Sequence, residues 1–450
     1  MNVSGVQVVG TGSYVPDQVV SSTDLESHLG LEAGWIEQRT GIRERRFASA
    51  DQATSDLAAA AVRAALVAEG NLAPRGMLVC ATSTPDWPQP ATAAQVHRLL
   101  NLPQTWGAFD INAVCSGFVH AFHIGDCLLS ADASLQQVIV VGADCYSRIT
   151  DPDHRATRVL FGDGAGAVVM ERFNSVAAQP VPGILGTHFG TTSEQLPALV
   201  VPGGGSRLPL DAVALEAGAN WFAMDGPAVR SFAEQAVARS ISEACAAASM
   251  TPEALDLVVL HQSNQRILES ALSQAGIDES KTIFTVAEYG NTAAASVAIT
   301  LDAAVRAGRV SRGDVVCLAG YGGGLSAWGA EVTIVSSIFA DNTATQPGTN
   351  DLDLNAESSI AISYSSFAYQ PPAGLAFVVG PGNLSVADPM FESPAAADYR
   401  LTAASTLRDV GAGAPAPNDD LDGRPRPQGG GIDLGAYELG TCGLAPTRSW

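Results

Sequence analysis

The first 336 residues alternate short aliphatic runs with alanine-rich amphipathic segments, and no other feature constrains the fold as strongly. Runs that are apolar on both faces predict buried strands, whereas the segments between them, such as "SDLAAAAVRAALVAEG", have helical spacing. Strands that alternate with helices predict a layered α/β domain whose central sheets are covered on both faces. The clearest strand candidates are "GMLVCATST", "QQVIVVGAD", "LDLVVLHQS" and "GDVVCLAGY".

Two of these strands belong to a faint internal repeat. "QQVIVVGAD" is followed by the glycine-rich "FGDGAGAVVMER", and "GDVVCLAGY" is followed by "GGGLSAWGAEVTIV". Each pair consists of a buried strand, a glycine-rich turn and a further strand. The repeat predicts two similar halves, residues 1–175 and 176–336.

Composition excludes several classes of function. The net charge of −22 makes nucleic acid and anionic membrane surfaces poor partners. The N-terminus resembles a first strand rather than a signal peptide, and no stretch approaches the roughly 20 apolar residues of a membrane helix. The seven cysteines are widely spaced without a CxxC pair, which favours a reducing cytoplasm over a disulfide framework or a zinc site.

Cys115 is the first candidate for chemistry. It lies in "AVCSGF", where an extended stretch gives way to a buried helical segment and only small residues follow. Unpaired N–H groups at a helix N-terminus stabilise a thiolate, and small neighbours let a substrate approach. The alternative interpretation is a small apolar residue of the core.

Polar residues that follow other strand-like runs strengthen this candidate. His261 ends "LVVLH", Asn264 stands three residues further on, and Asn291 begins another helical segment. Open α/β sheets place ligand crevices at such strand ends. Alone, His261 would be a structural histidine and Asn291 a helix cap. Together with Cys115 they supply a nucleophile, an imidazole and an amide donor.

Seven motifs in order across residues 1–335 resemble the β-ketoacyl-[acyl-carrier-protein] synthase III family. The resemblance implies a thiolase-like fold, a duplicated layered α/β/α/β/α domain. It also implies a cytoplasmic homodimer without a cofactor that uses acyl-CoA and acyl-carrier protein to begin fatty-acid synthesis. The motifs are "WIEQRTGIRERR", "AVCSGF", "DPDHRATRVLFGDGAGAVV", "VPGGGSR", "HQSNQRI", "YGNTAAAS" and "GYGGG".

The resemblance also implies catalytic roles. Cys115 would take the acyl group from CoA, and the N–H groups of Cys115 and Gly323 would hold the oxyanion. Malonyl-acyl-carrier protein would then lose CO2, with His261 and Asn291 hydrogen-bonded to the enolate. Asn264 would order a water network or, equally, cap a helix. "GGGLSAWG" is one residue longer than the usual motif, which leaves the oxyanion glycine open by one position.

By the same resemblance, Trp35 stacks on the CoA adenine, while Arg39 and Arg155 contact the nucleotide end. Arginine forks suit phosphate and the indole offers a flat apolar face. Arg266 matches a position that docks the acidic carrier. Gln89 stands where acetyl-selective members commonly place a bulky aromatic residue, in a loop that reaches the partner subunit's acyl pocket, so the primer stays open.

One helical face could suggest a metal site. His120, His123 and Cys127 have suitable spacing, but no fourth ligand is evident and core packing is the preferred interpretation. No metal is therefore expected. The glycines of "FGDGAGA" are interpreted as turn residues, because no phosphate-loop lysine follows them.

Helical periodicity stops after about residue 337, and Asn, Asp, Ser, Gly and Pro become frequent. Residues 337–450 resemble the end of a right-handed parallel β-helix of about three coils, and we expect a short β-rich or partly disordered module. Two alternatives to the main interpretation remain. One is a specialised ketosynthase or acyltransferase of secondary metabolism, and the other is a secreted or surface β-helix protein fused to an inactive synthase-like domain.

Overall fold

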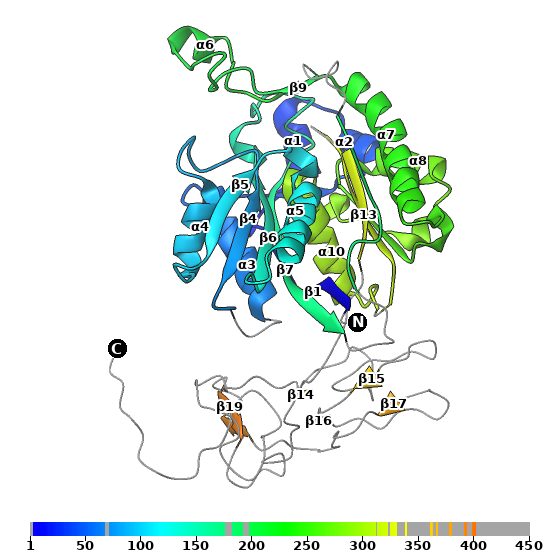
Figure 1. Ribbon diagram of the computed structural model, residues 1–450. Coiled ribbons are helices and arrows are strands. Elements are labelled where there is room, and N and C mark those ends of the chain that lie inside the picture. Colours follow the sequence, from blue (N-terminus) through cyan, green and yellow to red (C-terminus); the bar gives the residue numbers. More distant parts are fainter. Residues whose placement is uncertain are drawn as a thin grey trace. The chain divides into compact units, whose positions relative to one another are not determined.

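The computed structural model divides the chain into two units, Met1–Val332 and Thr333–Trp450, and all elements discussed for the site belong to the first. Figure 1 shows the elements. The residues that the structure describes are 3–67, 72–175, 182–191, 198–311, 313–322 and 325–330, with six short strands between 338 and 401.

The first sheet has five strands in the order β1-β7-β6-β4-β5. β7 pairs antiparallel with both β1 and β6, while β4 lies parallel to β6 and β5. Its central strands are aliphatic on both faces because helices cover both sides. The bounds are β1 (Val3–Tyr14), β4 (Gly76–Ala81), β5 (Gly107–Ile111), β6 (Gln137–Cys145) and β7 (Asp163–Ser175).

The second sheet repeats this arrangement in the order β8-β13-β12-β11. β13 pairs antiparallel with β8 and β12, and β11 is parallel to β12. Beyond β11, a single parallel bridge from Val258 to Thr282 occupies the place of a fifth strand. The duplication expected from the sequence is confirmed. The bounds are β8 (Thr187–Gly190), β11 (Leu257–Leu260), β12 (Val316–Gly320) and β13 (Leu325–Ala330).

Two helices, α5 (Gly117–Ala131) and α10 (Ser296–Arg306), lie between the sheets and contact both. α3 (Thr54–Val67) and α4 (Thr92–Leu100) cover the outer face of the first sheet. α7 (Gly226–Ala247) covers the second sheet, and α8 (Gln265–Gln274) packs beside it (Figure 1). This is the α/β/α/β/α order that the resemblance implied.

The central position of α5 explains its composition. Val114–Ala131 is the one helical segment, among the residues that the structure describes, long and apolar enough to span a membrane. Its apolar side chains, including Phe118, Val119 and Leu129, are buried in a core shared by the two sheets. The rest of the helix is less enclosed, since His120 and His123 are half-buried and Cys127 is exposed. Burial of its apolar face in the core accounts for the apolar sequence, whereas the core packing expected for Cys127 is wrong.

Each central helix begins with a strained turn that packs on the opposite sheet. The turn η1 (Val114–Ser116) precedes α5, and η6 (Ala293–Ala295) precedes α10. A Cβ on Gly320 of β12 would lie 2.9 Å from Ser116 Cα in η1, and one on Gly142 of β6 would lie 2.4 Å from the Ala294 carbonyl oxygen in η6. Both glycines are needed because only a residue without a side chain permits such an approach.

Smaller elements complete the first unit and need only their bounds. They are β2 (Gln18–Ser21), α1 (Ser22–Leu29), α2 (Trp35–Thr40), β3 (Glu44–Phe47), η2 (Tyr146–Arg148), β9 (Leu199–Val200), α6 (Ala212–Glu216), β10 (Ala223–Met224), η4 (Pro252–Ala254), η5 (Glu279–Lys281) and α9 (Val286–Tyr289).

In the second unit, the described segments form three short strand pairs. β14 (Ile338–Phe339) is parallel to β16 (Ser366–Phe367), and β15 (Ala361–Ile362) is parallel to β17 (Val378–Val379). β18 (Phe391–Ser393) and β19 (Asp398–Leu401) are antiparallel. Most of 337–450 lies outside the described residues, so the β-helix stays a prediction, as does the boundary at 336.

Candidate active site

Cys115 lies in the middle of η1, between the end of β5 and the start of α5. The turn has left-handed backbone at Val114, with φ of 48°. This conformation is rare for a β-branched residue and is maintained only where the surrounding structure enforces it. The Asn112 side chain contributes by accepting a hydrogen bond from the Val114 N–H at 3.1 Å.

The thiol of Cys115 is buried, with 7% of the residue exposed. Burial, and to a smaller extent the charge of Asp144, raises its pKa well above the usual value. The thiolate expected from a helix N-terminus is therefore not the resting form, because desolvation disfavours the charge more strongly. Gly322 packs closely against the thiol, since a Cβ at this position would lie 3.4 Å from Cys115 Sγ.

His261 follows β11 directly, and its backbone N–H donates to the Ala319 carbonyl of β12 at 2.8 Å. The ring Nδ1 lies 2.6 Å from Ser296 Oγ, at the start of α10. The Tyr321 ring packs edge-on against the imidazole at 4.9 Å. Complete burial lowers the pKa of His261 to about 3, so the imidazole is neutral at pH 7.

Asn291 is positioned by hydrogen bonds to the opposite half of the domain. Its backbone N–H donates to Leu160 at 2.8 Å, and its carbonyl accepts from Gly162 at 3.0 Å. The side-chain Oδ1 accepts from the Ala293 N–H at 2.9 Å, within η6. This bond orients the amide, so its NH2 group is the end available for a ligand.

Cys115, His261 and Asn291 line one cavity of about 170 Å³, together with Asn264 and Gly322. Three aromatic rings that sequence reasoning missed form an apolar wall beside Cys115. Tyr146 stacks on Phe161 at 4.5 Å, and Phe222 stands edge-on to both, at 5.5 and 5.2 Å. The structure thus brings the three predicted groups together at the end of an aromatic-lined chamber.

The buried carboxylate of Asp144 holds together the segments that surround this chamber. Asp144 Oδ1 accepts five hydrogen bonds from residues 82–84, and Oδ2 accepts one from the Ala294 N–H of η6 at 2.9 Å. Burial raises the pKa of Asp144, while these hydrogen bonds oppose the shift. Ser83 also bonds the Tyr146 hydroxyl at 3.1 Å, which connects the carboxylate to the aromatic wall.

The predicted CoA residues Trp35 and Arg39 lie on the short helix α2. The Arg39 guanidinium stacks over the Trp35 ring at 4.4 Å. The N-terminal end of α2 is held by Glu26, whose carboxylate accepts from Gly34 and Ile36, both at 2.8 Å. The half-buried indole and the exposed guanidinium thus form a preformed pair at the surface.

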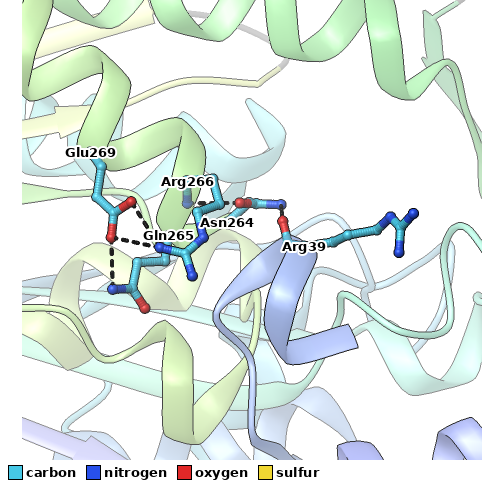
Figure 2. A network of polar contacts seen from close by, with 5 residues as sticks. All are labelled: Arg39, Asn264, Gln265, Arg266 and Glu269. Atoms are coloured by element: carbon cyan, nitrogen blue, oxygen red, sulfur yellow. Dashed lines mark hydrogen bonds and ion pairs between the residues drawn. The ribbon is translucent and has the colours of Figure 1, made fainter. Parts of the chain in front are cut away.

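Asn264 connects α2 with α8, as Figure 2 shows. It is the N-cap of α8, its Oδ1 accepts from the Arg266 N–H at 2.9 Å, and its Nδ2 donates to the Arg39 carbonyl at 3.4 Å. Asn264 therefore caps the helix and lines the cavity at once. Both interpretations considered from the sequence are compatible with this position.

The two remaining arginines are exposed. Arg266 pairs with Glu269 at 3.1 Å, and Gln265 donates to the same carboxylate at 2.9 Å (Figure 2). Arg155 lies near α1, with its guanidinium 3.5 Å from the Gly30 carbonyl. Both arginines stay available to an anionic partner, because surface ion pairs are weak.

The outcome differs for the three other predicted features, which are Gln89, Gly323 and the histidine and cysteine face of α5. Gln89 is exposed in the loop before α4 and does not line the cavity. Gly323 lies outside the described residues. His123 Nε2 lies 3.7 Å from Cys127 Sγ, but within the described ranges no group of three or more His, Cys, Asp or Glu is arranged to hold a metal.

Comparison with known proteins gives consistent matches to one family. Residues 109–193 match the family described as 3-oxoacyl-[acyl-carrier-protein (ACP)] synthase III, and residues 245–334 match its C-terminal region. An acetoacetyl CoA synthase of Streptomyces sp. (strain CL190) is 44% identical over 328 residues, which cover 71% of this chain and 96% of the relative.

A β-ketoacyl-[acyl-carrier-protein] synthase III of Rhodopirellula baltica is 39% identical over 342 residues, covering 73% of this chain and 98% of the relative. The crystal structure of a 3-oxoacyl-(acyl carrier protein) synthase III from Pseudomonas aeruginosa PAO1 superimposes with a TM-score of 0.65 at 33% identity, covering 73% of this chain and 98% of that one.

Proposed function

Because the chain belongs to the 3-oxoacyl-[acyl-carrier-protein] synthase III family, it is a condensing acyltransferase, and we propose that Cys115 is its nucleophile and that His261 and Asn291 stabilise the enolate. The observation that carries these assignments is that all three side chains line the same buried cavity. The reaction begins fatty-acid synthesis by joining a primer acyl group to a malonyl unit.

In the first half-reaction, Cys115 attacks the thioester carbonyl of an acyl-CoA. The new C–S bond replaces the bond to CoA, which leaves as the thiol with the proton that Cys115 loses. Because burial raises the pKa of the Cys115 thiol, its proton must leave during the attack rather than before it. The Cys115 N–H and, by resemblance, that of Gly323 hold the oxyanion.

In the second half-reaction, malonyl-acyl-carrier protein enters the same cavity and loses CO2. The electron pair of the broken bond becomes an enolate, whose oxygen accepts hydrogen bonds from His261 and Asn291. Neutral donors suit this step, because they stabilise negative charge without protonating the carbanion. The carbanion then attacks the acyl-cysteine, and the departing Cys115 thiolate takes up one proton from solvent.

Substrate delivery follows from the entrance residues. We assign Trp35, Arg39 and Arg155 to the CoA nucleotide, since a flat ring and guanidinium forks suit adenine and phosphate. Arg266 is assigned to docking of an acidic carrier protein. Asn264 caps α8 and also lines the cavity, and we assign it to ordering water near the enolate. The enzyme is proposed to act in the cytoplasm as a homodimer without a cofactor.

The aromatic wall favours a short primer. Tyr146, Phe161 and Phe222 close the chamber beside Cys115, and a cavity of about 170 Å³ must also admit the end of the CoA arm. We therefore propose primers of the acetyl to butyryl class. Gln89 would contribute from the partner subunit.

The proposal is tested by mass spectrometry of the intact protein after incubation with acetyl-, butyryl-, octanoyl- and malonyl-CoA. One acyl group should be added, with acetyl and butyryl preferred, and Cys115→Ala should not be labelled. Equal labelling of that variant would contradict the assignment. His261→Ala and Asn291→Ala should still acylate to some extent but fail in condensation, and a variant that condenses at the wild-type rate would remove that residue from the site.

A second candidate function is favoured by the relative at 44% identity, which is named an acetoacetyl CoA synthase. In this alternative the malonyl unit is carried on CoA rather than on acyl-carrier protein. Comparing kcat/KM for malonyl-CoA and malonyl-acyl-carrier protein decides between the two.

A further inference from the structure

The neutral imidazole of His261 has one protonated and one bare nitrogen, and the choice between them decides what the ring can do. A proton on Nε2 makes the ring a hydrogen-bond donor toward the cavity. A proton on Nδ1 leaves Nε2 as a base. The partner of Nδ1 fixes the choice, and that partner is Ser296 Oγ at 2.6 Å.

Ser296 Oγ has three neighbours and a single proton to donate. The Gln262 backbone N–H lies 3.3 Å away and can only donate to it. The serine proton must therefore go either to His261 Nδ1 or to the Ala293 carbonyl, 3.0 Å away. If it goes to Ala293, the ring must donate from Nδ1 and Nε2 is bare.

Two observations favour donation to the ring. The Ala293 carbonyl already accepts the Ser296 backbone N–H, so it does not need the hydroxyl proton. The His261 Nδ1 lies 2.6 Å from Ser296 Oγ and the Ala293 carbonyl oxygen lies 3.0 Å from it, so the ring nitrogen is the nearer acceptor for the hydroxyl proton. Both point to a serine hydroxyl that donates and an Nδ1 that accepts.

We propose that Ser296 holds His261 as the Nε2–H tautomer and thereby makes it a donor rather than a base. This inference deepens the proposed function, since it rests on the enolate role of His261. Asn291 is oriented in a parallel way, because the Ala293 N–H binds its Oδ1 and leaves its NH2 group to donate. Residues 293–296 thus set both donors, and Ser296 is a positioning residue that does not itself line the cavity.

The tautomer is measured by ¹⁵N NMR of histidine rings in the full-length wild-type chain, without substrate. His261 is identified among the seven histidines by the signals lost in His261→Gln. The expected result is an accepting Nδ1 and a protonated Nε2. A protonated Nδ1 in the wild type would overturn the proposal, whatever the activity shows.

Ser296→Ala should shift the ring toward the Nδ1–H tautomer and slow condensation by about tenfold, with a smaller effect on Cys115 acylation. Ser296→Thr keeps the hydroxyl and should restore both the wild-type tautomer and condensation. Thr300→Ala is the matched control, since it removes a buried hydroxyl one turn along α10 that bonds Thr285 at 2.7 Å and not His261.

An unchanged ring tautomer in Ser296→Ala would refute the proposal, and so would an equal tautomer shift in Thr300→Ala. If Ser296→Ala does not fold, the wild-type spectrum decides by itself. Failure of the proposed function would be seen in a different experiment, since His261→Ala would then condense at the wild-type rate. The ring tautomer measured in the wild type does not depend on that result.

Discussion

Replacing Asp144 by asparagine tests whether the buried carboxylate maintains the active-site turn. The carboxylate accepts six hydrogen bonds and donates none. In Asp144→Asn, the amide oxygen takes the position that accepts the five bonds from residues 82–84. The NH2 group then takes the other position and faces the Ala294 N–H. Two donors then meet in a fully buried position, and one N–H loses its acceptor.

The expected cost follows from these bonds. An unsatisfied buried N–H costs about 1–3 kcal/mol, and weakening five charge-assisted bonds brings the total to about 3–5 kcal/mol. Since domains are stable by only about 5–15 kcal/mol, the urea midpoint should fall clearly. Because η6 also carries the bond that orients Asn291, condensation should fall more than Cys115 acylation, about tenfold for each 1.4 kcal/mol lost at the transition state.

Asp163→Asn is the matched control. This carboxylate is equally buried and accepts from the backbone N–H groups of Ala48 and Ser147, both at 2.8 Å, but it does not bond η6. It should lower the urea midpoint and leave the ratio of condensation to acylation unchanged. The reasoning fails if Asp144→Asn keeps the wild-type midpoint, or if both variants change the ratio equally.

Three further predictions concern pH, chain length and the C-terminal segment. The free energy of unfolding should fall as the pH drops from 6.5 toward 3, by up to about 1.4 kcal/mol per pH unit, because unfolding lets His261 bind a proton that burial excludes; urea midpoints at pH 7 and 5 should differ less in His261→Gln. Phe222→Ala should raise kcat/KM for longer primers relative to acetyl-CoA by up to about fourfold per methylene, and an unchanged hexanoyl-to-acetyl ratio would exclude Phe222 from the acyl chamber. Residues 1–340 should melt like the full chain and still acylate Cys115, and aggregation or lost acylation would make the remainder an integral part of the enzyme.

The parts of the site that could be predicted are those with local patterns. The two sheets follow from aliphatic runs, and the repeated strand and glycine-turn pairs anticipate the duplication. Cys115 follows β5 and His261 follows β11 as expected, whereas Asn291 follows the short helix α9 instead of a strand and was found only through its motif. The residues that orient them have no such pattern, because their partners are distant in sequence. Ser296 lies 35 residues from His261, and Ala294 lies 150 residues from Asp144.

The protonation state of Cys115 could not be predicted from the sequence either. The position of Cys115 before a helix favoured a thiolate, but the degree of burial depends on how residues from both halves close over the thiol. The aromatic wall could not be predicted for the same reason. Tyr146, Phe161 and Phe222 come from three separate segments and meet only in the folded chain.

The glycine contacts of the two strained turns have a consequence for the order of folding. Gly320 of the second sheet receives the turn that carries Cys115, and Gly142 of the first sheet receives the turn that follows Asn291. Each turn with left-handed backbone therefore packs on a surface that belongs to the other half. We therefore expect the turn around Cys115 to reach its final geometry only after both halves have folded, so that a nascent chain holding only the first half would carry Cys115 without its active-site geometry.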